Sequence, residues 1–236
     1  MSVLAFDTET WLIAPGRLAP RLVCLSWSDG RTAAVLSADE GARWFRARLE
    51  AGDTLIGHNV AFDVAVLLQH DPSLRELIWL HYDQGLFSDT SIRDRLHHIA
   101  RGWYKQDRSG KRPQFSLSAL SARYLGKALD GKSDADAWRY RYRELDGIPI
   151  GEWPSEALTY ALEDARTTAR VWEAMPEASP DLARQVRSAW SLHLVSAWGL
   201  RTDPKAVAAL RSQLDARSSE LRATLVEAGL LRSTGA

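Results

Sequence analysis

The chain has 236 residues, and its 30 lysine and arginine residues balance 30 aspartate and glutamate residues. The zero net charge excludes a uniformly basic nucleic-acid-binding protein, and the 45% hydrophobic content argues against a disordered chain. The single cysteine, Cys24, excludes a disulfide framework and a cysteine-rich metal site. No apolar run approaches the ~20 residues of a membrane span. No signal peptide is recognised either, so we expect a cytoplasmic protein without membrane contact.

The first 70 residues predict an α/β arrangement around one central sheet. The dipeptide Asp29-Gly30 favours a hairpin turn between two of the predicted strands. The predicted strands are residues 3–6, 22–27, 32–36 and 54–56, and the predicted helices are residues 38–50 and 60–70.

The remaining chain is predominantly helical in its pattern. Pro154 suits the start of the clearest helix, which carries apolar residues at spacings of three and four. A composition break near residues 175–180 predicts a boundary between a domain at 1–176 and a helical extension at 177–236. The predicted helices are residues 89–100, 116–125, 154–174, 181–198 and 204–228, with an irregular segment at 127–152 that contains one short helix.

Two acidic residues end the first predicted strand. Asp7 and Glu9 are two positions apart, so both carboxylates point to the same face of the strand. Two like charges this close repel unless a cation or a hydrogen-bond network neutralises them. The alternative is a strand end that simply faces solvent.

A second motif lies where a predicted strand meets a helix. Asn59 and Asp63 are four residues apart and therefore share one face of that helix. Asp63 lies among apolar residues, where a carboxylate needs a partner. The alternative is that Asn59 caps the helix and Asp63 interacts with the helix dipole.

The third motif lies in the clearest helix. Tyr160 and Asp164 share one face, next to the apolar stripe. The alternative is an exposed hydrogen-bonded pair, which is common on helices.

Considered together, the acids of the three motifs predict a metal site with oxygen ligands. Carboxylate oxygens suit Mg²⁺ or Mn²⁺, and two such ions can activate a water and stabilise the leaving oxygen of a phosphodiester. Tyr160 is a poor base at neutral pH because the pKa of a phenol is ~10, but it can orient the attacking water. The predicted metal-binding residues are Asp7, Glu9, Asp63 and Asp164.

The strings Phe6-Asp-Thr-Glu-Thr10, Gly57-His-Asn-x-x-Phe-Asp63 and Tyr160-x-x-x-Asp164 resemble the three motifs of DnaQ-like 3′→5′ exonucleases, in their tyrosine-containing subgroup. The chain is most similar to the proofreading exonuclease domain of family A DNA polymerases over about residues 1–175. The pair Asp89-Thr90 and the segment Ser116–Leu125 also resemble that branch. The resemblance implies an RNase H-like fold and release of nucleoside 5′-monophosphates from a 3′ end.

The resemblance also implies roles for individual residues. Asp7, Glu9 and Asp164 would hold the metal that activates water, Asp7 would bridge to a second metal, and Asp63 would support that metal through water. Tyr160 would orient the nucleophile. The residues expected near the substrate are Thr8, His58, Asn59 and Phe62.

A basic segment lies between residues 93 and 112. It has seven lysine and arginine residues against two aspartates, with Trp103 and Tyr104 among them. Basic side chains contact phosphates and aromatic rings stack on unpaired bases, so this segment is predicted to guide a single strand through Arg108, Lys111 and Arg112. The alternative is a solvated loop.

The C-terminal residues resemble the segment of family A polymerases that leads into the thumb. We therefore expect residues 177–236 to dock on a polymerase domain or subunit, and we expect no polymerase activity from this chain alone. The alternative is that its two helices pack on the catalytic domain.

Two other functions remain open at this stage. One is an exoribonuclease similar to ribonuclease D, which would tolerate or contact the 2′-hydroxyl. The other is a non-catalytic domain that binds DNA or docks on a polymerase, against which the complete acid set argues.

Overall fold

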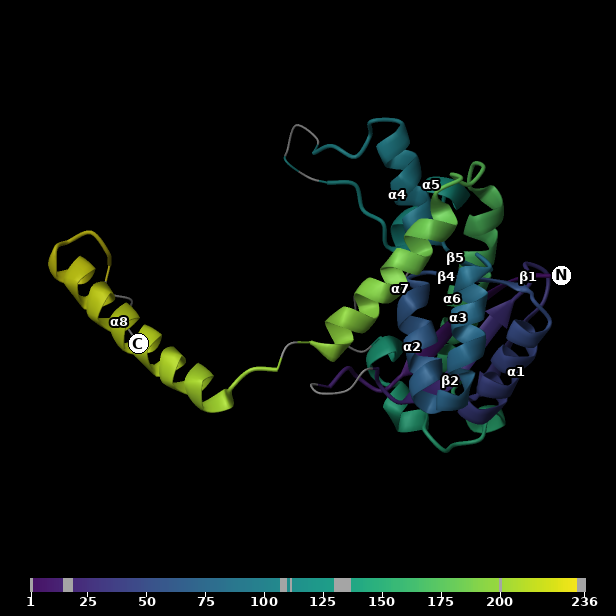
Figure 1. Cartoon of the computed structure of the whole chain (residues 1–236), viewed down its shortest axis with the longest axis horizontal. Coiled ribbons are helices and arrows are strands. Elements are labelled where there is room, and N and C mark those ends of the chain that lie inside the picture. The colour runs from purple at the N-terminus through teal and green to yellow at the C-terminus, as the bar shows by residue number, and fades with distance from the viewer. Residues whose placement is uncertain are drawn as a thin grey trace. The chain divides into compact units, whose positions relative to one another are not determined.

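The computed structural model describes residues 2–14, 19–106, 110, 112–129, 137–199 and 201–232. The chain divides into two compact units, Met1–Trp198 and Gly199–Ala236. The first unit contains one mixed sheet flanked by helices, and the second contains a single long helix in its described part (Figure 1). None of the helices in the described residues is both long and apolar enough to cross a membrane.

Five strands of the described residues form one sheet in the order β3-β2-β1-β4-β5. The central strand β1 pairs antiparallel with β2 and parallel with β4. Strands β2 and β3 form the predicted hairpin, and β4 and β5 are parallel. The strands are β1 (Val3–Thr10), β2 (Leu22–Ser28), β3 (Ala33–Ser37), β4 (Thr54–Gly57) and β5 (Phe87–Asp89).

The helices cover both faces of this sheet. Helices α1, α2, α3 and α7 lie on one side (Figure 1), and α6 packs against β1, β2 and β3. The α-helices are α1 (Ala38–Glu50), α2 (Val60–His70), α3 (Arg75–Asp83), α4 (Thr90–Ala100), α5 (Leu117–Leu125), α6 (Ser155–Ala174), α7 (Leu182–Trp198) and α8 (Pro204–Glu227). The short 3₁₀ helices are η1 (Pro72–Leu74), η2 (Trp138–Tyr140), η3 (Tyr142–Leu145) and η4 (Ile150–Glu152).

Alternate residues of β1 serve the two faces of the sheet. Leu4 and Phe6 enter the main core, where the Phe6 and Phe45 rings lie 5.3 Å apart and Phe87 extends the stack. Asp7 and Glu9 point to the opposite face, toward α6. The main core therefore fixes the strand while its other face stays available for polar groups.

The α6 face of the sheet is lined by small side chains. Ala157, Ala161 and Ala165 are all fully buried on α6, and the facing positions of β2 include Cys24 and Ser26. Small residues on both surfaces allow the helix to approach the strands closely. This approach brings Asp164, in the middle of α6, next to the polar end of β1.

The predicted mixed α/β sheet is confirmed, but three details of the prediction were wrong. Strand β1 continues beyond Phe6 to Thr10, because α6 covers its polar end. Helix α3 and strand β5 were not predicted, and β5 is only three residues long and buried by its neighbours. The segment expected to hold one short helix contains η2, η3 and η4.

Helix α7 belongs to the first compact unit. Its residues Leu182, Val186 and Trp190 are buried in the main core, and the ring of Trp190 stacks on Tyr82 at 5.3 Å. The compact unit therefore ends at Trp198, and a domain boundary at residue 176 stays a prediction. The physical reason is the apolar face of α7, which the core of the first unit covers.

Candidate active site

Three carboxylates converge at the carboxyl end of β1. Asp7 and Glu9 come from β1 and Asp164 comes from α6, and one oxygen of each lies within 4.8 Å of the others. Glu9 and Asp164 are buried, and Asp7 is half-buried. Carboxylates held this close repel one another, so the arrangement favours a bound cation. Three convergent oxygen donors fit a hard divalent ion such as Mg²⁺ or Mn²⁺.

A β-bulge lies directly beside this cluster. Glu9 pairs with Cys24 and the next residue, Thr10, pairs with Leu22, so Val23 is the extra residue on β2. Bulges are common next to active sites because they redirect side chains locally. The sequence gives no sign of this bulge.

Tyr160 lies next to the three acids. Burial raises the pKa of its phenol above the usual value of 10, and the charges of Asp164 and Glu9 raise it further. Tyr160 is therefore protonated across the physiological range. It can exchange hydrogen bonds with a water or a phosphate, but it does not act as a base.

A second tyrosine, Tyr142, packs against Tyr160. The Tyr142 ring lies 6.1 Å from the Tyr160 ring, and its hydroxyl donates a 2.7 Å hydrogen bond to the carbonyl oxygen of Ala157. Tyr142 is fully buried. The sequence analysis missed this residue because it lies in a segment without helical or strand periodicity.

Asp63 approaches β1 from the other face of the sheet. Its Oδ1 accepts hydrogen bonds from the Thr8 backbone N–H at 3.1 Å and from Thr8 Oγ1 at 2.6 Å. Thr8 alternates with Asp7 and Glu9, so the carboxylate of Asp63 is held on the side opposite to theirs. Burial raises the pKa of Asp63 to about 7, against the hydrogen bonds from Thr8 that lower it. The structure thus brings together three of the four predicted metal-binding residues, and a role for Asp63 in metal binding stays a prediction.

The same contact gives Thr8 a structural role, and its predicted position near the substrate stays a prediction. Thr8 is buried, and its hydroxyl donates to Asp63. In this arrangement Thr8 joins α2 to β1, which positions Asp63.

The side chain of Asp89 caps the N-termini of both α2 and α4. Its Oδ2 accepts a 2.8 Å hydrogen bond from the Val60 N–H in α2, and its Oδ1 accepts one of 2.9 Å from the Ile92 N–H in α4. The cap on α4 is local in the sequence, because Asp89 directly precedes that helix. The cap on α2 depends on the parallel pairing of β4 with β5, which places Asp89 beside Gly57.

The turn between β4 and α2 is tightly constrained. A Cβ atom on Gly57 would lie 2.9 Å from Val60 Cβ and 3.0 Å from Val60 Cα. Asn59 adopts the left-handed conformation with a φ of 70°. Asparagine tolerates this conformation better than most residues, and the turn leaves its side chain exposed.

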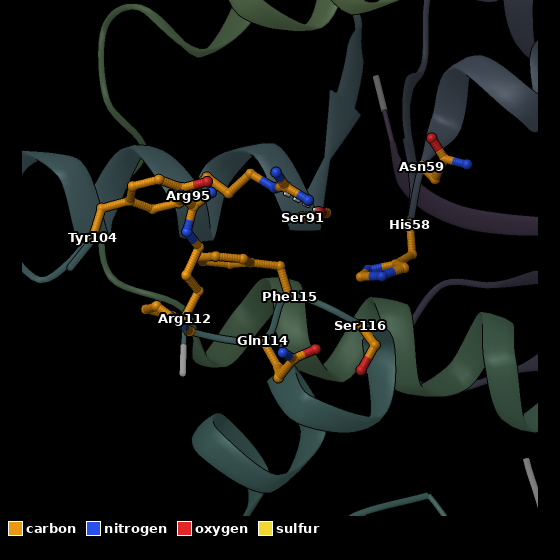
Figure 2. Close-up of a pocket in the computed structure, with 10 residues that line it drawn as sticks. His58, Asn59, Ser91, Arg95, Tyr104, Arg112, Gln114, Phe115 and Ser116 are labelled. Atoms are coloured by element: carbon orange, nitrogen blue, oxygen red, sulfur yellow. Dashed lines mark hydrogen bonds between the residues drawn. The ribbon is translucent and has the colours of Figure 1, made fainter. Parts of the chain in front are cut away.

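A pocket of about 420 Å³ lies beside this turn. Figure 2 shows His58 and Asn59 at one end and Arg95, Tyr104 and Arg112 at the other, with Phe115 between them. The Arg95 guanidinium lies 4.9 Å from the centre of the Phe115 ring, and the Tyr104 ring stacks on the same phenylalanine. Cationic groups and aromatic faces together suit a nucleic-acid strand. Three residues predicted to bind substrate, His58, Asn59 and Arg112, therefore share one pocket.

Other parts of the basic segment behave differently. Arg93 is buried, donates to the carbonyl oxygens of Trp172, Met175 and Pro176, and lies over the Trp172 ring at 3.9 Å. It therefore stabilises the end of α6 and is not part of a strand-binding surface. Arg108 and Lys111, both predicted to bind substrate, lie outside the described residues.

Phe62 lies on α2 and faces α7. Its ring packs edge-on against the His193 ring at 6.4 Å and contacts the main core. It does not line the pocket described above. The prediction that Phe62 lies near the terminal nucleotide stays a prediction.

The family of the chain follows from a comparison with protein-family models. The family DNA_pol_A_exo1, described as 3′-5′ exonuclease, matches residues 1–178. This range includes all three sequence motifs and the carboxylate cluster. The chain belongs to this exonuclease family. Such exonucleases depend on divalent metal ions, and the cluster of Asp7, Glu9 and Asp164 is suited to bind them.

Solved structures agree with this assignment at the level of the fold. The exonuclease (EXO) domain of Nibbler from Aedes aegypti is 13% identical, with a TM-score of 0.52 over 83% of this chain and 87% of that one. NrnC from Brucella melitensis, bound to pGG, is 17% identical, with a TM-score of 0.54 over 84% of this chain and 83% of that one. A comparison with curated proteins finds no match. The RNase H-like fold expected of this 3′-5′ exonuclease is thus confirmed.

Proposed function

We propose that this exonuclease removes nucleotides one at a time from the 3′ end of single-stranded or frayed DNA, releasing nucleoside 5′-monophosphates. The observation that carries the proposal is the convergence of Asp7, Glu9 and Asp164 next to a protonated Tyr160. The acids are suited to hold two Mg²⁺ or Mn²⁺ ions, with Asp63 as a supporting residue. Bound divalent ions would supply an activated water and neutralise the charge that develops on the phosphate.

The residues of the chain itself position the substrate. Tyr160 remains a neutral hydrogen-bonding group and aims the attacking water. The pocket lined by His58, Asn59 and Arg112 lies beside the turn that leads into α2, the helix that carries Asp63, so it is suited to receive the strand that leads to the scissile bond. Its arginines would contact phosphates, and its aromatic rings would stack on bases.

An exoribonuclease function is the second candidate. The observation that favours it is the fold shared with NrnC, whose structure was solved with the short ligand pGG. We infer DNA as the substrate from the family matched and from the motifs, and RNA is therefore an essential arm of the experiment.

The test is trimming of 5′-labelled single-stranded DNA and RNA of equal sequence, with Mg²⁺, Mn²⁺ or EDTA. The variant D7N should lose metal-dependent activity on both substrates. The matched control is E163Q, which changes an exposed acid adjacent to Asp164 on the same helix and should trim as the wild type does. Absence of metal-dependent trimming by the wild type would reject the enzyme function, and a preference for RNA would replace the DNA proposal.

We also propose that α8 docks on a family A polymerase domain, for which the exonuclease would proofread. An apolar stripe on this helix supports the proposal: Val207, Leu210, Leu214, Leu221 and Leu225 are all at least 37% exposed. The double variant L210S/L214S should lose co-elution with such a polymerase domain while it retains single-strand trimming. Unchanged co-elution would reject docking through this stripe.

A further inference from the structure

Two exposed aromatic side chains follow the end of α4. Trp103 and Tyr104 are 56% and 42% exposed, although tryptophan is highly buried on average in folded proteins. The backbone N–H of Trp103 donates a 2.7 Å hydrogen bond to the carbonyl oxygen of His98, which ties this segment to the last turn of α4. Trp103 and Tyr104 together form an aromatic platform on the surface of the first compact unit.

Phe115 lies behind this platform and is itself covered. The Tyr104 ring stacks on the Phe115 ring at 5.8 Å, and the His98 ring packs edge-on against Phe115 at 5.2 Å. The Arg95 guanidinium lies 4.9 Å from the centre of the same ring, which leaves Phe115 only 8% exposed. The Trp103 ring packs against His98 at 5.8 Å. A base from solvent can therefore reach Trp103 and Tyr104, whereas Phe115 supports them.

Helices α4 and α5 fix Phe115 in place through a buried carboxylate. Arg123 on α5 forms an ion pair with Asp94 on α4, and it donates a 2.9 Å hydrogen bond to the carbonyl oxygen of Gln114. The Tyr124 hydroxyl donates a 2.6 Å hydrogen bond to the same carboxylate, which is fully buried. The support of the platform is therefore ordered before any ligand binds, and this lowers the entropic cost of binding.

The surroundings of the platform are basic. The Arg101 guanidinium lies 4.8 Å from the centre of the Trp103 ring, and Arg95, Lys105 and Arg112 are also exposed. None of these four cations forms an ion pair with an acidic side chain in the part of the chain that the structure describes. Exposed flat rings among cations complement a ligand that carries both planar rings and regular negative charge. Single-stranded nucleic acid has this combination.

The platform lies away from the carboxylate cluster. Figure 2 shows Tyr104 at one end of the pocket and His58 and Asn59 at the other. Asn59 directly precedes α2, whose Asp63 accepts the hydrogen bond from Thr8 in β1, so this end is the one that leads to the cluster. A strand cut at its 3′-terminal bond continues from there in one direction only, toward its 5′ end. Nucleotides upstream of the scissile bond therefore reach the platform.

We propose that Trp103 and Tyr104 stack on bases of single-stranded DNA upstream of the 3′ end, and that this contact gives the enzyme a preference for long strands over short ones. The inference rests on the proposed exonuclease function. Every base has a flat face, so stacking of this kind tolerates any sequence. A strand long enough to reach the platform gains this contact, whereas a dinucleotide occupies only the catalytic end of the pocket.

The experiment compares W103A and W103F with the wild type. The matched control is W198A, because Trp198 at the end of α7 is 90% exposed and lies outside the basic segment. Binding of a 5′-labelled 16-nucleotide single strand is measured by fluorescence anisotropy in EDTA, where no cleavage is expected. Steady-state trimming with Mg²⁺ then gives kcat and KM for the same strand and for a dinucleotide.

We expect W103A to weaken binding of the long strand roughly 5- to 150-fold, which is the contribution of one stacked base. Its KM for the long strand should rise by a similar factor at unchanged kcat, and its trimming of the dinucleotide should stay as in the wild type. W103F keeps an aromatic ring and should recover most of the binding, and W198A should behave as the wild type. Thermal unfolding of all variants shows whether the fold is intact.

Two results would overturn the proposal. One is equal binding of the long strand by W103A and W198A. The other is an equal loss of trimming by W103A on the dinucleotide and on the long strand, because a stacking contact upstream cannot affect the shorter substrate. If the wild type trims neither substrate, the exonuclease function is rejected, and the binding comparison alone decides whether the platform holds a single strand.

Discussion

The buried carboxylate of Asp89 caps two helices at once. Replacing Asp89 should therefore lower the free energy of unfolding by more than the loss of an ordinary single cap. One oxygen accepts from Val60 in α2 and the other accepts from Ile92 in α4. Both helices begin at the carboxyl ends of β4 and β5, on the same side of the sheet as the carboxylate cluster at the end of β1. We expect the loss of Asp89 to destabilise the first compact unit and the turn that carries His58 and Asn59.

The magnitude follows from the number of hydrogen bonds lost. Loss of one N-cap acceptor costs about 1 kcal/mol, with an upper value of about 2 kcal/mol. D89A leaves two N–H groups without an acceptor and should cost about 2–4 kcal/mol. D89N keeps one acceptor oxygen and removes a negative charge that adds to the effect of burial on the pKa of Asp63, so it should cost about 1 kcal/mol.

The assay is urea unfolding at 25 °C and pH 7, followed by tryptophan fluorescence. A single-cap control is S116A, because Ser116 caps α5 with one hydrogen bond to the Ala119 N–H. D89A should lower the midpoint about twice as far as S116A, with an unchanged slope. A cost for D89A no greater than that of S116A would refute the double cap.

Three further predictions concern the same edge of the sheet. Because burial raises the pKa of Asp63 to about 7, the protonated form stabilises the fold, and this stability is lost as the pH rises through 7. In EDTA the titration of Asp63 should therefore lower the free energy of unfolding by about 2.5 kcal/mol between pH 5 and pH 8. D63N should remove that part, and the pH dependence that remains belongs to other acids such as Asp89, whose pKa burial also raises. G57A should cost about 1–3 kcal/mol in urea unfolding because its Cβ overlaps Val60, and wild-type stability would contradict the close approach. Y160F should lower kcat roughly 10- to 100-fold without changing the melting temperature, and an unchanged kcat would exclude its role in aiming the water.

The acid cluster could be predicted from the sequence because strand and helix periodicities are local. A period of two places Asp7 and Glu9 on one face, and a period of 3.6 places Tyr160 next to Asp164. Tyr160 and Asp164 lie in the expected helix, and Asp7 and Glu9 lie in β1, which extends past its predicted end at Phe6. The structure brings Asp7, Glu9 and Asp164 together. The resemblance of the motifs, in this order along the chain, to those of 3′→5′ exonucleases predicted that Asp164 would join Asp7 and Glu9 in one site.

Features that depend on tertiary contacts could not be predicted in this way. No local pattern shows that Asp63 reaches β1 from the face opposite to Asp7, because that depends on how α2 crosses the sheet. Composition placed Arg93 in a basic surface, whereas three carbonyl oxygens at the end of α6 bind it. Strand β5 has only three residues, too few to show the alternation of apolar and polar side chains that predicts a strand. It is recognised as a strand only by its hydrogen-bonded pairing with β4.

Because successive side chains of β1 point to opposite faces of the sheet, the active site forms only when this strand is in its correct register. Phe6 fills the core on one face, and Asp7 meets Asp164 on the other. A shift of the strand by a single residue would place the acids in the apolar core and the phenylalanine in the carboxylate cluster. Any such misaligned chain would be unstable and inactive at once, so quality control that removes unstable molecules also removes those with a misassembled nuclease site.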